Sequence, residues 1–392
     1  MSAMKAPGAN GKAGDHSVGA EGKRRVFLAE AAEFRGNVES ESMITSHDRI
    51  TAALEHRTLD RIPLCETGFW PEALRRWESE GMPKGVDPHA FFGLDRIYNP
   101  HPFDCGFFDH VIYEDDGEYV TDLNGQGTVV KWAKVRDSSA GHMELDHKVK
   151  TIADWREARR RLTVTETRFR EVAPPPPGDF HVISALDHFW TSFTMCGMEN
   201  LCCWLVLAPD EMREIYDDYV TFLIGMLDLS LKRLPPFQGL WFYSDMAFHS
   251  GPMFSPQTYR DVVAPGYARL RAWCDQHDKW MLLHTDGNLD VLMPELIRSG
   301  FDWLHPLEAR AGNDVRQMKP RYGDQVTLVG NINMDVLARG NKDEIEKEVA
   351  TKVEAAKING GYVFNSDHSV PPTVAFESYS FAVKVAKKHG RY

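Results

Sequence analysis

The sequence predicts an α/β fold of the (β/α)₈ TIM-barrel type. From Phe180 onward, short apolar runs with strand character alternate with amphipathic helical segments. Such alternation is typical of parallel strands joined by right-handed crossovers. No Gly-rich G-x-G-x-x-G or P-loop turn follows any strand, which disfavours an open nucleotide-binding sheet. With 392 residues, 43% of them hydrophobic, the chain can bury the core of one large barrel with extensions.

Seven of the eight strands are visible as apolar runs. They are expected at 61–66, 180–186, 239–245, 279–284, 301–306, 326–331 and 362–365. The eighth strand is expected in the less regular region between Phe91 and Trp132. Helices are expected at 198–233 with a break near Pro209, and at 256–277, 290–299, 315–322, 342–358 and 374–388. The count of strands favours a closed barrel over an open sheet.

Two segments fall outside the repeated pattern. Residues 1–40 are rich in Gly, Ala and Ser and are expected to form a disordered or weakly ordered tail, which leaves 41–392 as the barrel domain. Residues 111–135 alternate in β fashion around two turn signals, Asp116-Gly117 and Asn124-Gly125. This segment is expected to be a β-hairpin inserted into the barrel.

Composition excludes several classes of partner. The net charge is −12, which disfavours nucleic acid as the main partner. No apolar run approaches the ~20 residues of a membrane-spanning helix, so no membrane partner is expected. The six cysteines form no C-x-x-C pair and are too sparse for a disulfide framework. A reducing cytoplasm is the expected location.

Polar residues follow several of the predicted strands. His284 and Asp286 close one run, His305 and Glu308 close the next, and His368 follows the last. Because the carboxyl ends of all strands in such a barrel meet at one face, these side chains are expected to converge on one pocket.

Several motifs resemble the uroporphyrinogen decarboxylase superfamily from about residue 45 to the C-terminus. They are His56-Arg-Thr-Leu-Asp60-Arg61-Ile-Pro63, Tyr243-Ser-Asp245, Gly251-Pro-Met-Phe-Ser255-Pro256, Gly312-Asn-Asp314, Gly330-Asn-Ile-Asn333, Gly360-Gly-Tyr-Val-Phe and Pro371-Pro372. The resemblance implies a distorted (β/α)₈ barrel. The superfamily includes porphyrinogen decarboxylases and zinc-dependent methyltransferases that use corrinoid proteins or thiols.

Two departures place the chain closer to the methyltransferase-like branch. The decarboxylases carry Met-Arg-Gln-Ala-Gly-Arg after the first strand to grip substrate carboxylates, whereas this chain has Glu66-Thr-Gly-Phe-Trp70 there. The methyltransferases carry His-x-Cys after one strand and a Cys after the last. Those slots fall on His284-Thr-Asp286 and on His368, so nitrogen and oxygen donors replace thiolates. Such a set leaves a bound metal more Lewis acidic.

The resemblance and the strand-end positions together assign the candidate site. The expected metal ligands are His284, Asp286 and His368, with Zn²⁺ as the expected ion. Fe²⁺ is the alternative, because the order His-x-Asp…His is also that of iron sites. The expected catalytic or orienting residues are Glu66, Asp245, His305 and Glu308. The expected substrate-binding residues are Phe69, Trp70, Tyr243, Phe248, His249 and Asn331.

The leading functional expectation is a metal-dependent methyltransferase or demethylase. It moves a methyl group from a small O- or N-methylated substrate to a thiol or to a corrinoid carried by a separate protein, since no Asp-x-His-x-x-Gly corrinoid motif is visible here. A decarboxylase or lyase of a small carboxylic acid and a non-catalytic ligand-binding barrel are the alternatives. Because related barrels often pair through one face, a homodimer is the expected assembly.

Overall fold

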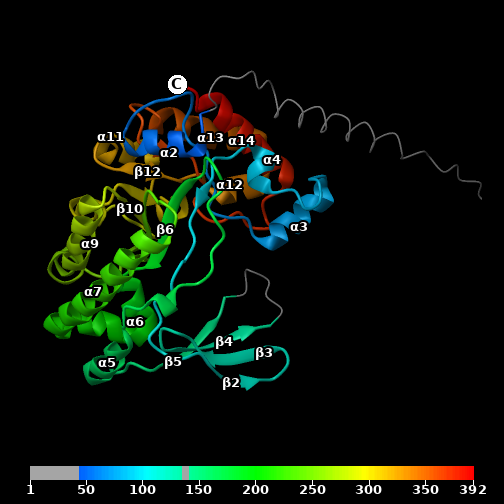
Figure 1. Cartoon of the computed structure of the whole chain (residues 1–392). Helices are drawn as coiled ribbons and strands as arrows, with labels where there is room; N and C mark the ends of the chain where they lie inside the picture. The colour runs from blue at the N-terminus through cyan, green and yellow to red at the C-terminus, as the bar shows by residue number, and fades with distance from the viewer. Residues whose placement is uncertain (1–43, 135–140) are drawn as a thin grey trace, which may run out of the picture.

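The chain forms a parallel β-barrel surrounded by helices (Figure 1). The computed structural model describes residues 44–134 and 141–392. Seven strands run in parallel in the order β1-β6-β7-β10-β11-β12-β13. Their bounds are Ile97–Tyr98 (β1), Phe180–Leu186 (β6), Gly239–Tyr243 (β7), Trp280–His284 (β10), Trp303–His305 (β11), Thr327–Val329 (β12) and Tyr362–Val363 (β13). The predicted fold class is confirmed.

The segment around Leu64 closes the barrel. Leu64 forms a parallel bridge with Phe364, just beyond β13. On its other side the carbonyl oxygen of Leu64 accepts a hydrogen bond from the backbone N–H of Asp95, at 2.6 Å, just before β1. The first predicted strand, 61–66, therefore lies between the two edges of the sheet. The eighth strand, expected between Phe91 and Trp132, is β1.

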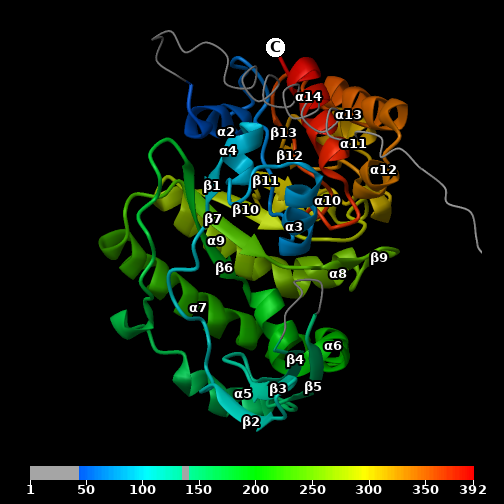
Figure 2. The same ribbon diagram turned by 90° about the vertical axis from the view of Figure 1, so that its right-hand side faces the viewer.

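Helices cover the outside of the barrel in both views (Figure 1, Figure 2). Their bounds are Ser46–Leu54 (α2), Pro71–Glu80 (α3), Pro88–Phe92 (α4), Ile152–Ala158 (α5), His188–Leu207 (α6), Pro209–Arg233 (α7), Pro256–Thr258 (α8), Ala264–Gln276 (α9), Met293–Arg298 (α10), Val315–Tyr322 (α11), Met334–Arg339 (α12), Lys342–Ala356 (α13) and Phe376–His389 (α14). None of the helices in the described ranges has both the length and the apolar character needed to cross a bilayer.

The short helix α12 was not expected from the hydrophobic pattern. The side chain of Asn333 accepts hydrogen bonds from the backbone N–H groups of Asp335 and Val336, which caps its first turn. Gly340 ends the helix in the left-handed conformation, with φ 71°. Capping residues at both ends thus specify a helix too short to show a helical period.

Helix α2 closes the amino-terminal end of the barrel. Its buried Ile50, Ala53 and Leu54 pack against the side chains that fill the barrel interior. Those interior side chains are Phe180, Val182, Trp241, Leu282, Trp303, Val329 and Val363. The barrel is therefore a packed core at this end, and the opposite end, where the strands finish, is left for the site.

The inserted segment is larger than the predicted hairpin. It forms a four-stranded antiparallel sheet of β2 (Val111–Asp115), β3 (Tyr119–Leu123), β4 (Thr128–Ala133) and β5 (Met143–His147). The fourth strand lies beyond residue 135 and was not predicted, because its short run carries no turn signal of its own. The sheet packs on α6, where a Cβ on Gly197 would come within 2.7 Å of the His147 ring. The predicted tail, 1–40, lies outside the described residues.

A buried carboxylate holds the closing segment in place. Asp95, 3% exposed, accepts hydrogen bonds from the guanidinium groups of Arg49 and Arg61 and from the backbone N–H of Leu64 at 2.8 Å. These bonds tie α2 and the first strand to the chain that enters β1. Removing the carboxylate would leave two partly buried guanidinium groups short of a partner.

We predict that Asp95→Ala lowers the free energy of unfolding by roughly 3–5 kcal/mol. Asp60→Ala is the control, because Asp60 pairs with the same Arg49 at 2.7 Å but is half-exposed. We expect the control to cost about 1 kcal/mol or less. Urea denaturation of both variants measures the difference. Equal losses in the two variants would contradict this role of Asp95.

Candidate metal and substrate site

The carboxyl ends of the barrel strands bring the candidate residues together. His284 and His305 are the last residues of β10 and β11. Asp245 lies two residues beyond β7, and Asp286 lies two residues beyond β10. In a barrel these ends form one rim, which is where such folds bind their substrates. The predicted convergence of these strand ends is therefore realised in the fold.

Three side chains form a group that can hold a metal ion. One ligand atom from each of Asp245, His284 and Asp286 lies within 4.8 Å of the other two. The Nε2 atom of His284 is 3.8 Å from Oδ1 of Asp245 and 3.9 Å from Oδ1 of Asp286. Oδ1 of Asp286 is buried and has no hydrogen-bond partner among the described residues. A buried carboxylate oxygen without a partner is costly, and a cation held between these three side chains would satisfy it.

This group differs from the predicted ligand set. His368 is not part of the group but lies near it, since its charge lowers the pKa of both His284 and His305, and Asp245, which was expected to orient substrate, takes the third place. The chain after β13 explains the difference. Oδ1 of Asp367 accepts a hydrogen bond from the backbone N–H of Met334 at the start of α12, at 3.0 Å, and this fixes the turn. His368 follows that turn, and its Nδ1 atom lies 3.3 Å from the carbonyl oxygen of Ser369.

Burial and neighbouring negative charges raise the pKa of two carboxyl groups at the rim, Asp286 and Asp367. Burial, together with the nearby negative charges of Asp245, Glu308 and Asp367, raises the pKa of Asp286 to about 7. The guanidinium of Arg310 opposes this shift. Burial and the charge of Glu308 also raise the pKa of Asp367. Such crowding of like charges favours binding of a cation.

A hydrogen-bonded chain runs from the metal group into the barrel. The Nδ1 atoms of His284 and His305 are 2.8 Å apart. On the other side of the His305 ring, Nε2 lies 2.6 Å from Nδ2 of Asn365 and 2.7 Å from Oγ1 of Thr67. Burial and the neighbouring imidazoles hold the pKa of His305 well below its usual range, and burial lowers that of His284. Both rings are therefore neutral, as metal-binding histidines must be.

The donors in this chain fix where the protons lie. Because the amide nitrogen of Asn365 donates to Nε2 of His305, His305 carries its proton on Nδ1 and donates it to His284. His284 then carries its proton on Nε2, between the two carboxylates. A cation that replaces this proton requires the order to reverse, with Nδ1 of His284 donating to His305. His305 is thus the residue that orients the predicted ligand.

Glu308 and Asn331 hold the loops that carry the site. Oε2 of Glu308 accepts a hydrogen bond from the backbone N–H of Gly287 at 2.9 Å. Gly287 has φ 88°, and a Cβ there would lie 2.3 Å from the carbonyl oxygen of Ala247. The fully buried Asn331, expected to bind substrate, donates to the carbonyl oxygens of Leu307 and Asn313, both at 2.8 Å. The contacts of Asn331 therefore hold neighbouring loops in place.

Glu66 lies deeper than the metal group. It is 7% exposed, and its carboxylate accepts hydrogen bonds from Ser366 Oγ, Tyr379 Oη at 2.9 Å and the backbone N–H of Thr67 at 3.0 Å. Burial raises its pKa to about 8, even though these hydrogen bonds act in the opposite direction. Glu66 is therefore mostly protonated at neutral pH. Its carboxylate is bonded by three protein partners and is not part of the group that could hold a metal ion.

The predicted aromatic residues divide into three groups. Tyr243 lies beside the site, with its ring 5.0 Å from that of His284, and Trp70 lies 6.2 Å from the His368 ring. Phe69 packs edge-on against Trp77, His89 and Tyr379 in the core beneath α3. Phe248 and His249 are exposed at the turn between β8 (Ala247–Phe248) and β9 (Gly251–Pro252). Tyr243 and Trp70 are thus the aromatic residues that contact predicted metal ligands, His284 and His368 respectively.

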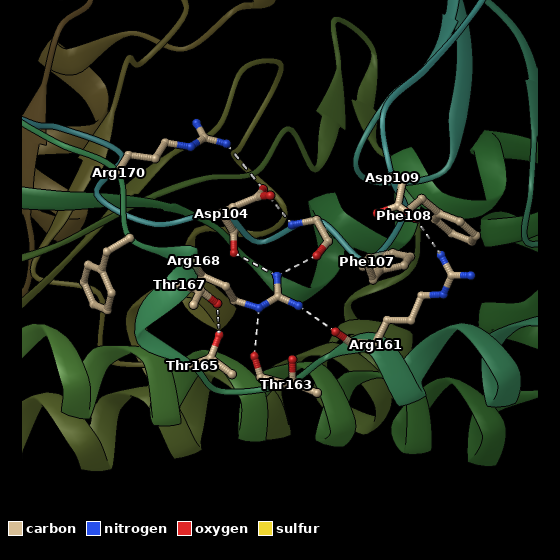
Figure 3. A pocket seen from close by; sticks show the side chains of 12 residues that line it. Asp104, Phe107, Phe108, Asp109, Arg161, Thr163, Thr165, Thr167, Arg168 and Arg170 are labelled. Atoms are coloured by element: carbon tan, nitrogen blue, oxygen red, sulfur yellow. Dashed lines mark hydrogen bonds and ion pairs between the residues drawn. The ribbon is translucent and has the colours of Figure 1, made fainter.

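A hollow of about 670 Å³ lies beside the inserted sheet, away from the strand ends (Figure 3). Its central side chain is Arg168, which donates to the carbonyl oxygens of Thr163, Asp104 and Gly106 at 2.8, 3.1 and 2.7 Å. Arg170 at its edge pairs with Asp104 at 3.3 Å. These cations are used to fasten loops, so the hollow offers little free charge to a ligand.

We predict that zinc affinity of the metal group rises between pH 6 and pH 8. Because the pKa of Asp286 is about 7, a proton occupies the site below that pH and must leave on binding. The apparent affinity should fall about tenfold per pH unit below pH 7. Asp286→Asn should bind weakly and lose this pH step. Titration of the metal-free protein with zinc tests this, and a wild-type affinity that is constant from pH 6 to 8 would contradict it.

We predict that Glu66 reduces stability as the pH rises. Its folded-state pKa of about 8 lies above the ordinary value of 4.5, so its contribution is full below pH 4.5 and is lost as the pH rises through 8. Glu66→Gln should gain stability relative to the wild type by up to about 1.4 kcal/mol per pH unit in that window. The exposed Glu346→Gln is the control. Denaturation curves at pH 5 to 8 that shift alike in both variants would count against this.

Comparison with known proteins identifies the family. Residues 178–389, more than half of the chain, match the family model described as uroporphyrinogen decarboxylase (URO-D). A uroporphyrinogen decarboxylase of Saccharophagus degradans is 30% identical over 96 residues, which is 24% of this chain and 23% of the relative. One from Sodalis glossinidius is 32% identical over 106 residues, 24% of this chain and 30% of the relative. The chain thus spans less than a third of the curated relatives it matches.

One solved structure has the same fold over nearly its whole length. A methyltransferase from Methanosarcina mazei aligns with a TM-score of 0.56 at 15% identity, covering 88% of this chain and 99% of the other. At that identity the likeness shows the fold alone. The family match and the barrel geometry agree, and the chain belongs to the uroporphyrinogen decarboxylase family.

Proposed function

We propose that this protein is a metal-dependent methyltransferase or demethylase acting on a small O- or N-methylated compound. The observation that carries the proposal is the group of Asp245, His284 and Asp286 at the barrel rim. Two carboxylates and an imidazole form a hard donor set that suits Zn²⁺ and also Fe²⁺. The buried Oδ1 of Asp286, which lacks a protein partner among the described residues, fits such an ion.

The ion would supply Lewis-acid polarisation of the oxygen or nitrogen that carries the methyl group. Asp245 and Asp286 would hold it, with Nε2 of His284, and two negative charges would offset its charge. His305 would keep the His284 ring in position through the bond between their Nδ1 atoms. Tyr243, whose ring lies 5.0 Å from that of His284, would form one wall of the pocket for the substrate.

The reaction requires a nucleophilic acceptor. The bond between the methyl carbon and the substrate oxygen or nitrogen breaks, and its electron pair stays on the leaving atom. The methyl carbon forms a new bond to the acceptor, a reduced corrinoid on a partner protein or a thiolate. The leaving atom then takes a proton. A corrinoid partner or a thiol is therefore the third component of the assay.

Decarboxylation of a small carboxylic acid is the second candidate, and Arg310 is the observation that favours it. Its guanidinium is only loosely paired, 4.0 Å from Glu308 and 3.8 Å from Asp335. It lies close enough to lower the pKa of Asp286 and Asp367. A cation at this rim could bind a substrate carboxylate. This reaction would release carbon dioxide without an acceptor.

The test combines metal content with methyl transfer. We expect purified protein to bind one zinc ion and to demethylate a methoxylated or N-methylated substrate only when a corrinoid protein or a thiol is added. His284→Ala should lose the ion and at least about 100-fold in rate, because it removes a ligand. His142→Ala is the control, since His142 is exposed on the inserted sheet.

Each other outcome has a definite meaning. Full metal content and full activity in His284→Ala would overturn the proposal. Release of carbon dioxide without metal or acceptor, lost in Arg310→Ala, would establish the second candidate instead. Ligand binding without turnover under any acceptor would leave a binding protein built on the same barrel.

A further inference from the structure

A small cavity lies inside the barrel beneath His305. Its volume is about 30 Å³, and it is lined by Trp241, Trp303, Asn365 and Glu66 among others. Trp241 and Trp303 also form part of the packed barrel interior. The cavity therefore separates that packed interior from the hydrogen-bonded histidines of the rim.

Three buried polar atoms belong to side chains that line this cavity. The indole nitrogens of Trp241 and Trp303 and Oδ1 of Asn365 have no hydrogen-bond partner within 44–134 and 141–392. These side chains are 3%, 0% and 2% exposed. Buried N–H and C=O groups are almost always satisfied in folded proteins, so three such atoms around one cavity indicate a shared ligand.

The chemistry of the three atoms identifies the ligand. Two of them are donors and one is an acceptor, so the ligand must both accept and donate hydrogen bonds. A metal cation cannot accept from an indole N–H, and a simple anion cannot donate to an amide oxygen. A cavity of about 30 Å³ has room for one or two water molecules, each of which usually makes about three hydrogen bonds.

We propose that this cavity is an internal water site that positions Asn365. A water that accepts from the indole groups and donates to Oδ1 of Asn365 holds the amide with its nitrogen toward His305. That orientation fixes the proton order of the pair His305 and His284. Asn365 and the water are thus the inner end of the chain that orients His284, whatever reaction the rim performs.

Two measurements on the full chain test this site. A high-resolution crystal structure should show ordered water within hydrogen-bond distance of the indole nitrogens and of Oδ1 of Asn365. In the metal-free protein, the ¹⁵N chemical shifts of His305 should report a single tautomer with the proton on Nδ1. Trp303→Phe removes one donor and keeps an aromatic ring, so it should lose or displace the water and populate the second tautomer of His305.

The matched control is Trp155→Phe. The Trp155 indole donates to Asp218 at 3.2 Å, in the region of α5 and outside the barrel. It should leave both the water and the His305 signals unchanged. A dry cavity in the wild-type structure would overturn the proposal even if Trp303→Phe failed to fold. So would a folded Trp303→Phe protein whose His305 signals match those of the wild type.

Discussion

The parallel register of β7, β10 and β11 is the constraint on which the site depends. His284 is paired in register with Tyr243 on one side and with His305 on the other. In a parallel sheet, residues in register point to the same face, so the three rings stand in a row on neighbouring strands. Their centroids are 5.0 and 4.9 Å apart. A shift of one residue in β10 would turn His284 to the other face and separate all three rings.

The rim of the barrel concentrates negative charge that the fold alone does not neutralise. The charges of Asp245, Glu308 and Asp367 raise the pKa of Asp286, the charge of Glu308 raises that of Asp367, and the Arg310 guanidinium opposes both shifts. Burying like charges together costs free energy, which the protein recovers by protonation or by binding a cation. We therefore propose that the site exists in two forms, one protonated and one metal-bound. The same property that makes it unfavourable in isolation makes it suited to a divalent ion.

The alternation of apolar and helical segments predicted most of the architecture. The rule that polar residues at the ends of barrel strands meet at one face predicted the region of the site. Alternating apolar segments located the barrel strands because each strand carries its own hydrophobic run, and Asp245, His284 and Asp286 all lie in strand-end positions read from the sequence. The rule could not give the direction of each side chain. His368 sits past a turn fixed by the bond from Met334 to Asp367, and this contact joins segments 33 residues apart. The amide nitrogen of Asn331 donates both of its hydrogen bonds to backbone carbonyls of neighbouring loops.

Other features needed three-dimensional information. Asn365 and Thr67 reach His305 from the two segments that close the barrel, and neither carried a metal-binding pattern in the sequence. Asn365 did end a predicted strand, so the rule that found His284 could have included it. Strand β5 lay beyond the turn signals of the insertion, and α12 was too short to show a period. The bonds to His305 depend on contacts between residues far apart in the sequence, whereas β5 and α12 were missed because their local sequence signals are weak.

Anomalous X-ray diffraction at the zinc edge, on crystals grown with zinc, would show directly whether Asp245, His284 and Asp286 bind a metal ion. We expect one strong peak within coordination distance of Nε2 of His284 and of carboxylate oxygens of Asp245 and Asp286. Nδ1 of His284 should still form its hydrogen bond with His305. A peak ligated by His368 in place of Asp245, or crystals with no peak at the barrel rim, would contradict it.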